Sequence, residues 1–595
     1  MNFWNKIVDK WKNITIWVTV MKYIIVALVP VVAFYLMEFY EHNPFIEVRE
    51  KAQYLNIILF ELIAWFLFFV IGSARAALRT ELVLAMVFGL INHYVMAFRS
   101  TPFVPWDILS VRTAASVASE YDFTPTRRVV IVTLLFLALI GLLQFLKLKP
   151  KMRWQFRLTG GIVLFVGLWT FTGLLQDDDF QDRSYLYPFL FTPVYMTKVN
   201  GMAVTFAMNL EYIVIERPAG YSVEKAEAIL REYEEEPSAV PDGYPNIIVI
   251  MDEAFSDMAV VGDFKPSEDY MPFVHSLQQG AENTVTGYAE VSVCGGNTAN
   301  SEFEFLTGNT MAFLPVGSIP YQQYIKSECP SMASYLKSLG YETYGQHPYN
   351  ATGWSRNTVY PLLGLDNNIF LKDYDYRKYL RDYQSDWADF MQIIYTYENH
   401  ESDKPMFLFN VTMQNHGGYT EKYDNFTPDI TVSGISSEVV STYLSLIKKT
   451  DESVQMLVDY FAKVDEKTMI VFFGDHQPNT AVSSPIFRYN GVDPNNLTEE
   501  QRLSRYVVPY FIWANYDIEE ETNCNLSLNY LGTTVLKKAG VPTSAYMNFL
   551  EAVQEKYASI TANRIAGSDD AGEEAEDILQ DYKIVQYYYL FDWKE

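Results

Sequence analysis

The sequence predicts a five-span α-helical membrane domain followed by an α/β extracellular domain. Five apolar runs of helical length lie in the first third of the 595 residues. After about residue 245, short apolar runs alternate with helical patterns, which is typical of α/β folds. The charge is divided in the same way: residues 1–176 hold 17 Lys and Arg against 10 Asp and Glu, whereas the remainder holds 28 against 62.

The apolar runs are each close to the ~20 residues that a helix needs to cross hydrocarbon. Buried helices of a soluble protein are the alternative, but five such runs exceed the content of an ordinary core. Basic residues gather before the first run, between the second and third, and between the fourth and fifth. The positive-inside rule then predicts a multi-pass protein of the cell membrane, with its N-terminus in the cytoplasm and the chain outside the cell after Asp177. The runs are Tyr23–Tyr40, Tyr54–Gly72, Leu82–Phe98, Val129–Leu146 and Gly160–Leu175.

We expect four parts along the chain. Residues 1–176 form the transmembrane domain. Residues 177–244 read as a juxtamembrane helical linker, because short helical patterns there end in a Pro- and Gly-rich boundary. Residues 245–549 form the extracellular α/β domain, and residues 550–595 read as an acidic C-terminal tail, either a solvated surface or a loose segment.

Composition excludes several classes of partner and site. A net charge of −27 argues against nucleic acid, because phosphate binding needs a basic face. Three cysteines provide neither a disulfide framework nor a Cys-rich zinc site.

The α/β domain is expected to contain a doubly wound, mostly parallel sheet. Length and β-branching distinguish its strands, and Gly or helical periodicity separates them. The predicted strands are Asn246–Met251, Tyr341–Gln346, Met406–Met413, Thr468–Phe473 and Val507–Trp513. The predicted helices among them are Ser331–Leu339, Ser437–Lys463 and one near Leu531–Ala539.

Polar residues follow directly after these strands, where open α/β sheets bind ligands. Glu253, Asp475 and His476 offer carboxylate and imidazole donors, a mixed set that suits manganese, zinc or magnesium. His347 and His416 also follow predicted strands. A single histidine at such a place is usually structural, but three together with two carboxylates favour a functional site.

A nucleophile is predicted from the segment after residue 293. Thr298 follows a Gly pair and begins a helical pattern, so its hydroxyl would lie at the positive end of a helix and near a bound metal. A simple N-cap role for Thr298 is the alternative. Cys294 is a rival nucleophile, although a packed thiol is the plainer interpretation because no general base can be assigned to it.

These features, in this order, resemble the lipoteichoic acid synthase family, which has five membrane helices and an outer domain of the sulfatase/alkaline-phosphatase superfamily. The resemblance implies that the α/β domain is sulfatase-like and catalytic. It is carried by NIIVIMDEAFSD (246–257), GGNTANSEFEF (295–305), HPYNATGWSRNTVYPLLG (347–364), TMQNHGGY (412–419) and FFGDHQP (472–478).

The resemblance implies a role for each matching residue. Glu253, Thr298, Asp475 and His476 match the metal ligands, with Mn2+ the usual ion and Mg2+ or Zn2+ as alternatives. Thr298 also matches the catalytic nucleophile. The positions that hold phosphoglycerol are matched by His347, Trp354, Arg356 and His416, and His416 could also donate to the leaving alkoxide.

By the same resemblance, glycerol phosphate passes from phosphatidylglycerol through a threonine-linked intermediate to lipoteichoic acid or another cell-surface acceptor, a glycolipid or polysaccharide. Two departures, Asn297 before the nucleophile and Pro348-Tyr349-Asn350 after the matching histidine, leave open whether the product is a polymer or a single transfer. A phosphoethanolamine transferase or a related sulfatase-fold phosphodiesterase or hydrolase is the rival enzyme. A regulatory membrane protein with an inactive domain is a rival of another class.

Overall fold

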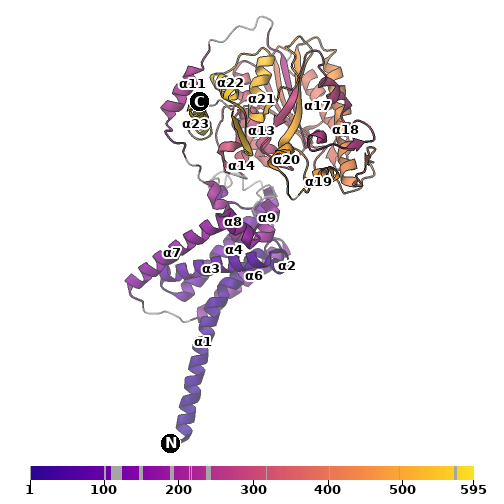
Figure 1. Cartoon of the computed structure of the whole chain (residues 1–595). Helices are drawn as coiled ribbons and strands as arrows, with labels where there is room; N and C mark the ends of the chain where they lie inside the picture. The colour runs from indigo at the N-terminus through magenta and orange to yellow at the C-terminus, as the bar shows by residue number, and fades with distance from the viewer. Residues whose placement is uncertain are drawn as a thin grey trace. The chain divides into compact units, whose positions relative to one another are not determined.

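The computed structural model describes residues 2–594 except for 100–101, 109–123, 147–151, 188–192, 214, 216, 236–242, 316–317, 401–402, 495 and 568–572. The chain forms two compact units, Met1–Val214 and Ile215–Glu595. Both units are drawn in Figure 1.

The first unit is helical. A helix covers most or all of each of the five predicted runs (Figure 1): α1 (Asn2–Glu38), α3 (Glu50–Ile71), α4 (Ala74–Arg99), α6 (Arg127–Leu142) and α7 (Trp154–Gln176). Among the described residues, four segments are long and apolar enough to cross a membrane: Val20–Glu38, Glu50–Ile71, Arg127–Phe145 and Trp154–Gln176. The remaining helix, α4, carries Arg75, Arg79 and Glu81 in its first turns.

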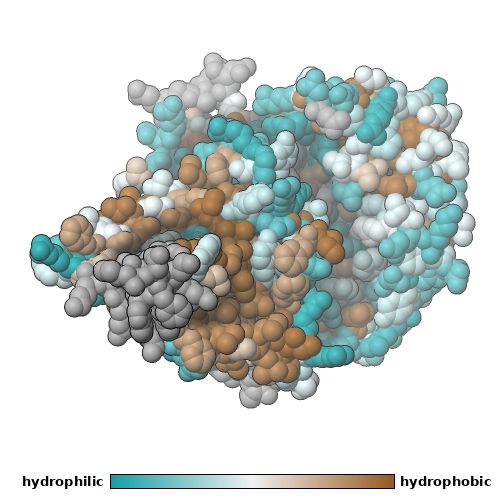
Figure 2. All heavy atoms as spheres, turned by 90° about the horizontal axis from the view of Figure 1, so that it is seen from below, coloured by the Kyte–Doolittle hydropathy of each residue, from teal (hydrophilic) through white to brown (hydrophobic). Residues whose placement is uncertain are grey.

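Large apolar side chains cover the outside of this unit. Trp169 is 75% exposed, and most exposed large apolar side chains of the described residues lie before residue 211. Figure 2 shows them gathered over the helices of the first unit. An apolar surface of this extent is suited to lipid rather than water. The predicted fold class, an apolar helical region followed by an α/β domain, is confirmed.

Part of the expected linker belongs to the first unit. The segment after α7 folds into three short helices, α8 (Asp178–Ser184), α9 (Pro193–Asn200) and α10 (Met202–Met208). The backbone N–H of Met202 donates to the buried carboxyl of Glu38 at 2.7 Å, and the Asn56 amide donates to the Asn200 carbonyl at 2.7 Å. Helix α2 (Pro44–Glu47) completes this unit.

An eight-stranded sheet organises the second unit, in the order β12-β3-β11-β10-β1-β8-β4-β5. Five neighbouring strands from β10 to β5 run parallel, whereas β11 is antiparallel to both β10 and β3. The sheet is therefore mixed, and the predicted parallel part extends from the middle of the sheet to its β5 edge. The strands are β1 (Asn246–Asp252), β3 (Thr284–Glu290), β4 (Glu342–His347), β5 (Asn367–Phe370), β8 (Met406–Val411), β10 (Thr468–Gly474), β11 (Val507–Ala514) and β12 (Leu526–Ser527).

Helices cover both faces of this sheet (Figure 1). Alternate residues of β1 face opposite cores, so that Val249 packs into one and Ile250 into the other. A strand buried on both faces must be apolar throughout, which explains the run NIIVIM. One core includes α13 (Thr298–Thr307), α15 (Met332–Ser338), α16 (Arg356–Leu362), α21 (Leu528–Lys538) and α22 (Ala545–Lys556). The other includes α12 (Pro272–Leu277), α17 (Asp386–Glu398), α18 (Glu438–Phe461) and α19 (Thr480–Tyr489).

The expectation of a loose C-terminal tail is wrong for the described residues. Strands β13 (Tyr557–Thr561) and β14 (Arg564–Gly567) form a hairpin, and α23 (Glu573–Tyr587) buries Tyr582, Ile584 and Val585 in the first core. The Gln586 amide exchanges two hydrogen bonds with the Thr310 backbone, at 2.8 and 2.9 Å. The acidic composition did not predict this packing, because only a narrow apolar stripe of α23 is buried. Helix α11 (Val223–Glu232) contacts α22 and α23 and so belongs to the second unit.

Candidate active site

Two neighbouring parallel strands bring the acidic residues together. Strands β1 and β10 end side by side, with Asp252 paired in register with Gly474. A side chain at Gly474 would place its Cβ 1.9 Å from the Phe255 carbonyl oxygen, so only glycine allows the two loops to approach this closely. The Ala254 N–H donates to Asp475 Oδ1 at 2.7 Å, which locks one loop onto the other.

Glu253, Asp475 and His476 form a compact set of donors. One ligand atom of each lies within 4.8 Å of the others, and all three side chains are buried. His476 Nδ1 lies 2.9 Å from the Gln477 carbonyl and donates a hydrogen bond to it. Nε2 therefore carries a lone pair that could bind a metal, and it faces Asp475 Oδ2 at 3.3 Å. Both of these facing atoms are buried without a hydrogen-bond partner among the described residues.

The donor set fits a divalent cation. Burial and the adjacent Asp475 charge raise the pKa of Glu253 to about 8, which shows how unfavourable the two carboxylates are without a counter-charge. A cation bound here would satisfy the two unpartnered atoms and offset that repulsion. Two carboxylates and one imidazole are hard or borderline ligands, as predicted for manganese, magnesium or zinc.

Thr298 lies beside this set at the start of α13. Its Oγ1 donates to Glu253 Oε2 at 3.4 Å. The N-cap of α13 is Asn297, in the left-handed region at φ 68°, so the interpretation of Thr298 as a simple N-cap is wrong. Helix α13 is also fixed to the strand end, because Ser301 Oγ donates to the Asp475 carbonyl at 2.6 Å.

The Cys294 thiol is poorly suited to nucleophilic attack. It packs against the backbone of residues 477–478 and accepts a contact from the Arg505 guanidinium at 2.9 Å. Burial raises the pKa of Cys294 to about 11 despite Arg505, so the thiol is protonated at neutral pH.

Arg356 and His347 lie against each other next to the metal set. His347 Nδ1 donates to the Val411 carbonyl at 2.8 Å, and its Nε2 accepts from Arg356 Nη1 at 3.0 Å. Burial, with the Arg356 charge beside it, lowers the pKa of His347 well below its usual value, which keeps the imidazole neutral. The positive charge of Arg356 opposes the rise in the pKa of Glu253, so Arg356 is within electrostatic reach of the metal set.

A partner that the sequence analysis missed holds Arg356. Glu302 accepts from Arg356 Nε at 3.0 Å and from Nη2, and the Tyr360 hydroxyl donates to the other Glu302 oxygen at 2.8 Å. These bonds and the one to His347 leave one N–H on each terminal nitrogen of Arg356 for a ligand. Glu302 lies one turn after Thr298 on α13, and its place in the motif SEFEF gave no signal of this role.

Trp354 and His416 complete the predicted set. Trp354 is half-buried and lies in the left-handed region at φ 53°, as does Ser355 at φ 60°. Such strained backbone is concentrated at functional sites. His416 is exposed on one side, yet partial burial and the Arg381 charge lower its pKa.

A short hairpin that the sequence analysis did not identify fixes the orientation of His416. It consists of β6 (Tyr379–Leu380) and β7 (Tyr383–Gln384), joined through Arg381 at φ 56°. The buried Arg381 guanidinium donates to the Gln414 and His416 carbonyls, at 2.7 Å each. Tyr383 Oη lies 3.0 Å from His416 Nδ1.

Comparisons with known proteins agree with this architecture. The model of the sulfatase family matches residues 245–541. A protein of Rhizobium meliloti (strain 1021) named "Putative cyclic beta-1,2-glucan modification protein" is 30% identical over 534 residues, covering 85% of this chain and 81% of its own. From the same organism, the capsular polysaccharide biosynthesis protein RkpI is 28% identical over 237 residues, covering 39% of this chain and 41% of its own.

A similar fold is present among solved structures. The phosphoglycerol transferase GacH of Streptococcus pyogenes, in complex with sn-glycerol-1-phosphate, superposes with a TM-score of 0.52 and 21% identity. The match covers 63% of this chain and 95% of that structure.

Proposed function

Because this chain belongs to the sulfatase family, we propose that it is a metal-dependent phosphoglycerol transferase of the cell membrane. The observation that carries the proposal is the Thr298 hydroxyl at the start of α13, 3.4 Å from Glu253 and beside the buried donors Asp475 and His476. The second unit lies outside the cell in this proposal, where phosphatidylglycerol of the outer leaflet is the donor.

The site residues divide the reaction into two displacements. Thr298 Oγ1 attacks the phosphorus of phosphatidylglycerol while its proton passes to Glu253, and the bond from phosphorus to the diacylglycerol oxygen breaks, which leaves glycerophosphoryl-threonine. His416 gives a proton to the departing oxygen. An acceptor hydroxyl then attacks the phosphorus, Thr298 Oγ1 leaves and takes its proton back from Glu253, and the acceptor proton returns to His416.

The surrounding residues orient the phosphate and neutralise its charge. The Thr298 hydroxyl hydrogen is directed to Glu253, which leaves an oxygen lone pair free for phosphorus. The two remaining N–H groups of Arg356 bind phosphoryl oxygens, and Trp354 lines the glycerol. A divalent ion, manganese in our proposal, would be held by Glu253, Thr298, Asp475 and His476 and would supply Lewis-acid stabilisation of the phosphoryl oxygens.

The proposed acceptor is a glycolipid or polysaccharide of the cell surface. A similar protein is named for the modification of a cyclic glucan, and another for capsular polysaccharide biosynthesis, which supports a glycan hydroxyl as the second nucleophile.

Diacylglycerol release from labelled phosphatidylglycerol tests this function, using the purified full-length protein with manganese. We expect release by the wild type and a loss of about 10³-fold or more in Thr298→Ala. Thr480→Ala is the matched control, because Thr480 also begins a helix after an asparagine N-cap but is exposed. Release from phosphatidylethanolamine alone would instead identify a phosphoethanolamine transferase. Retained release in Thr298→Ala would refute the nucleophile.

A further inference from the structure

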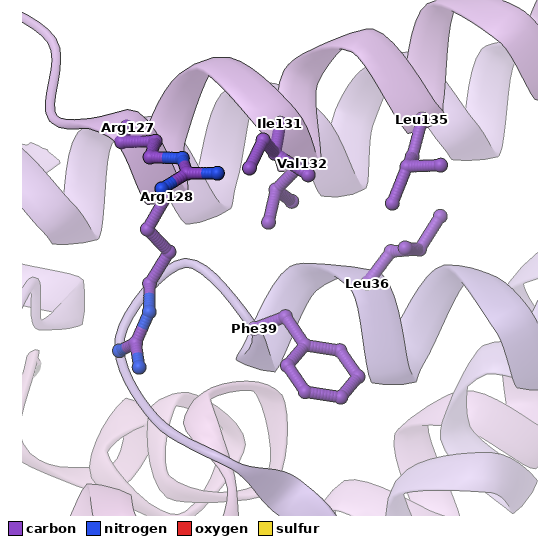
Figure 3. A pocket seen from close by; sticks show the side chains of 7 residues that line it. All are labelled: Leu36, Phe39, Arg127, Arg128, Ile131, Val132 and Leu135. Atoms are coloured by element: carbon purple, nitrogen blue, oxygen red, sulfur yellow. The ribbon is translucent and has the colours of Figure 1, made fainter.

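A groove between two helices of the first unit combines an apolar wall with a cationic end. Its volume is about 570 Å³, and it lies between α1 and α6. Leu36 of α1, Phe39 directly after α1, and Ile131 and Leu135 of α6 line its length, together with Val132. Arg127 and Arg128 lie at one end (Figure 3). We call this cavity the α1–α6 groove.

The apolar wall faces the surroundings of the membrane unit. Ile131 is 47% exposed and Leu135 is 50% exposed. Both helices contribute segments long and apolar enough to cross a membrane, Val20–Glu38 and Arg127–Phe145. A side chain exposed on such a segment meets lipid, so whatever lies along the groove must itself be apolar for most of its length.

Arg127 and Arg128, at the cationic end of the groove, keep N–H donors available for a ligand. Within the described ranges, Arg127 makes no ion pair, and Arg128 uses one guanidinium nitrogen on the Glu41 carbonyl. The nearby Glu41 carboxylate is already bonded to His93 Nδ1, at 2.5 Å. Two guanidinium groups at the end of a membrane-spanning segment need anionic oxygens, and arginine matches the geometry of a phosphate particularly well.

We propose that the α1–α6 groove binds one acidic glycerophospholipid. Its phosphodiester contacts Arg127 and Arg128, and an acyl chain lies along Leu36, Ile131 and Leu135. The groove has the volume of a site for a small organic ligand, which suits one chain with its glycerol. The two positive charges favour a headgroup with net negative charge over a zwitterionic one. This inference concerns the first unit only and does not rest on the proposed function.

Competition between lipids tests the proposal. The full-length protein, purified in a mild detergent and stripped of lipid, is titrated with phosphatidylglycerol or phosphatidylcholine, and bound lipid is counted by native mass spectrometry. We expect one equivalent of phosphatidylglycerol to be retained in preference to phosphatidylcholine. The double variant Arg127→Gln/Arg128→Gln should weaken retention by about tenfold or more. Arg153→Gln, at the exposed N-cap of the apolar helix α7, is the matched control and should retain the lipid.

A second pair of variants tests the apolar part of the groove independently of the two arginines. Leu135→Trp fills the groove and leaves both arginines in place, so it should weaken lipid retention. Leu134→Trp is its control, because Leu134 is 59% exposed on the same helix and does not line the groove. Equal retention of phosphatidylcholine would show annular lipid only and overturn the proposal. Unchanged retention in the double arginine variant or in Leu135→Trp would overturn it as well.

Discussion

Replacing Glu302 by glutamine should destabilise the second unit strongly, even though the change is nearly isosteric. The Glu302 carboxylate compensates the buried Arg356 guanidinium and accepts the Tyr360 hydroxyl. Glutamine keeps one carbonyl oxygen, but its amide nitrogen is a donor and meets another donor at Arg356. The buried arginine charge then loses the anion to which it is hydrogen-bonded.

The magnitude follows from the burial of the pair. The side chains of Glu302 and Arg356 are 0% and 3% exposed, so solvent screening is negligible. Removing one partner of such a pair costs about 3–5 kcal/mol. Glu290→Gln is the matched control, since its pair with Arg564 is 23% and 41% exposed. An exposed pair contributes at most about 1 kcal/mol.

Urea unfolding of the full-length protein in detergent measures the difference, with pulse proteolysis reporting the folded fraction of the second unit. Metal is held at a fixed excess, because binding to the folded state shifts the midpoint. With a slope of about 3 kcal/mol per molar urea, Glu302→Gln should lower the midpoint by about 1–1.7 M. A shift no larger than that of Glu290→Gln would refute the buried-charge reasoning.

Three further predictions concern the metal, His416 and the C-terminus. Asp475→Asn should lower the metal content of the purified protein about tenfold or more, measured by elemental analysis; unchanged content would exclude Asp475 as a ligand. Tyr383→Phe, which removes the hydroxyl beside His416, should lower kcat for diacylglycerol release several-fold with little change in KM. Tyr379→Phe, at an exposed residue of the same β6–β7 hairpin, should leave kcat unchanged. Equal losses of kcat in the two variants would argue against orientation of the His416 imidazole by Tyr383. Deleting residues 573–595 should expose apolar core and make the second unit sensitive to limited proteolysis, whereas full resistance would restore the interpretation of a loose tail.

Local signals were sufficient for the strands β1, β4, β8, β10 and β11, but not for β3, β5 and β12, and they did not indicate that β11 runs antiparallel. The runs at 246–251 and 468–473 are apolar throughout because both faces of those strands are buried. Strand β3 (TVTGYAE) escaped prediction, since polar and glycine residues interrupt its apolar pattern. Its pairing with β11 joins segments more than 200 residues apart, and no local pattern encodes such a partner.

The site shows a similar division. Glu253, Asp475 and His476 were predictable as neighbours because parallel strands end at one edge of a sheet. Arg356 was expected from the resemblance to hold phosphoglycerol, but its hydrogen bonds to Glu302 and His347 were not predicted. That arrangement depends on the packing of α13 against α16, which sequence periodicity does not specify. The roles assigned to these residues in catalysis stay predictions until the variants are assayed.

The anchoring of α13 limits how the preference for a lipid donor could change during evolution. Helix α13 carries Thr298, is hydrogen-bonded to the end of β10 through Ser301, and pairs with Arg356 through Glu302. It therefore sets the spacing from Thr298, the proposed nucleophile, to Arg356, the proposed phosphate ligand, whatever group the phosphate bears. We expect selection for a new headgroup to spare this spacing and to change other residues near the site, and residues 348–350, which directly follow His347 at the end of β4, are candidates. Directed evolution of donor preference should begin with those three positions.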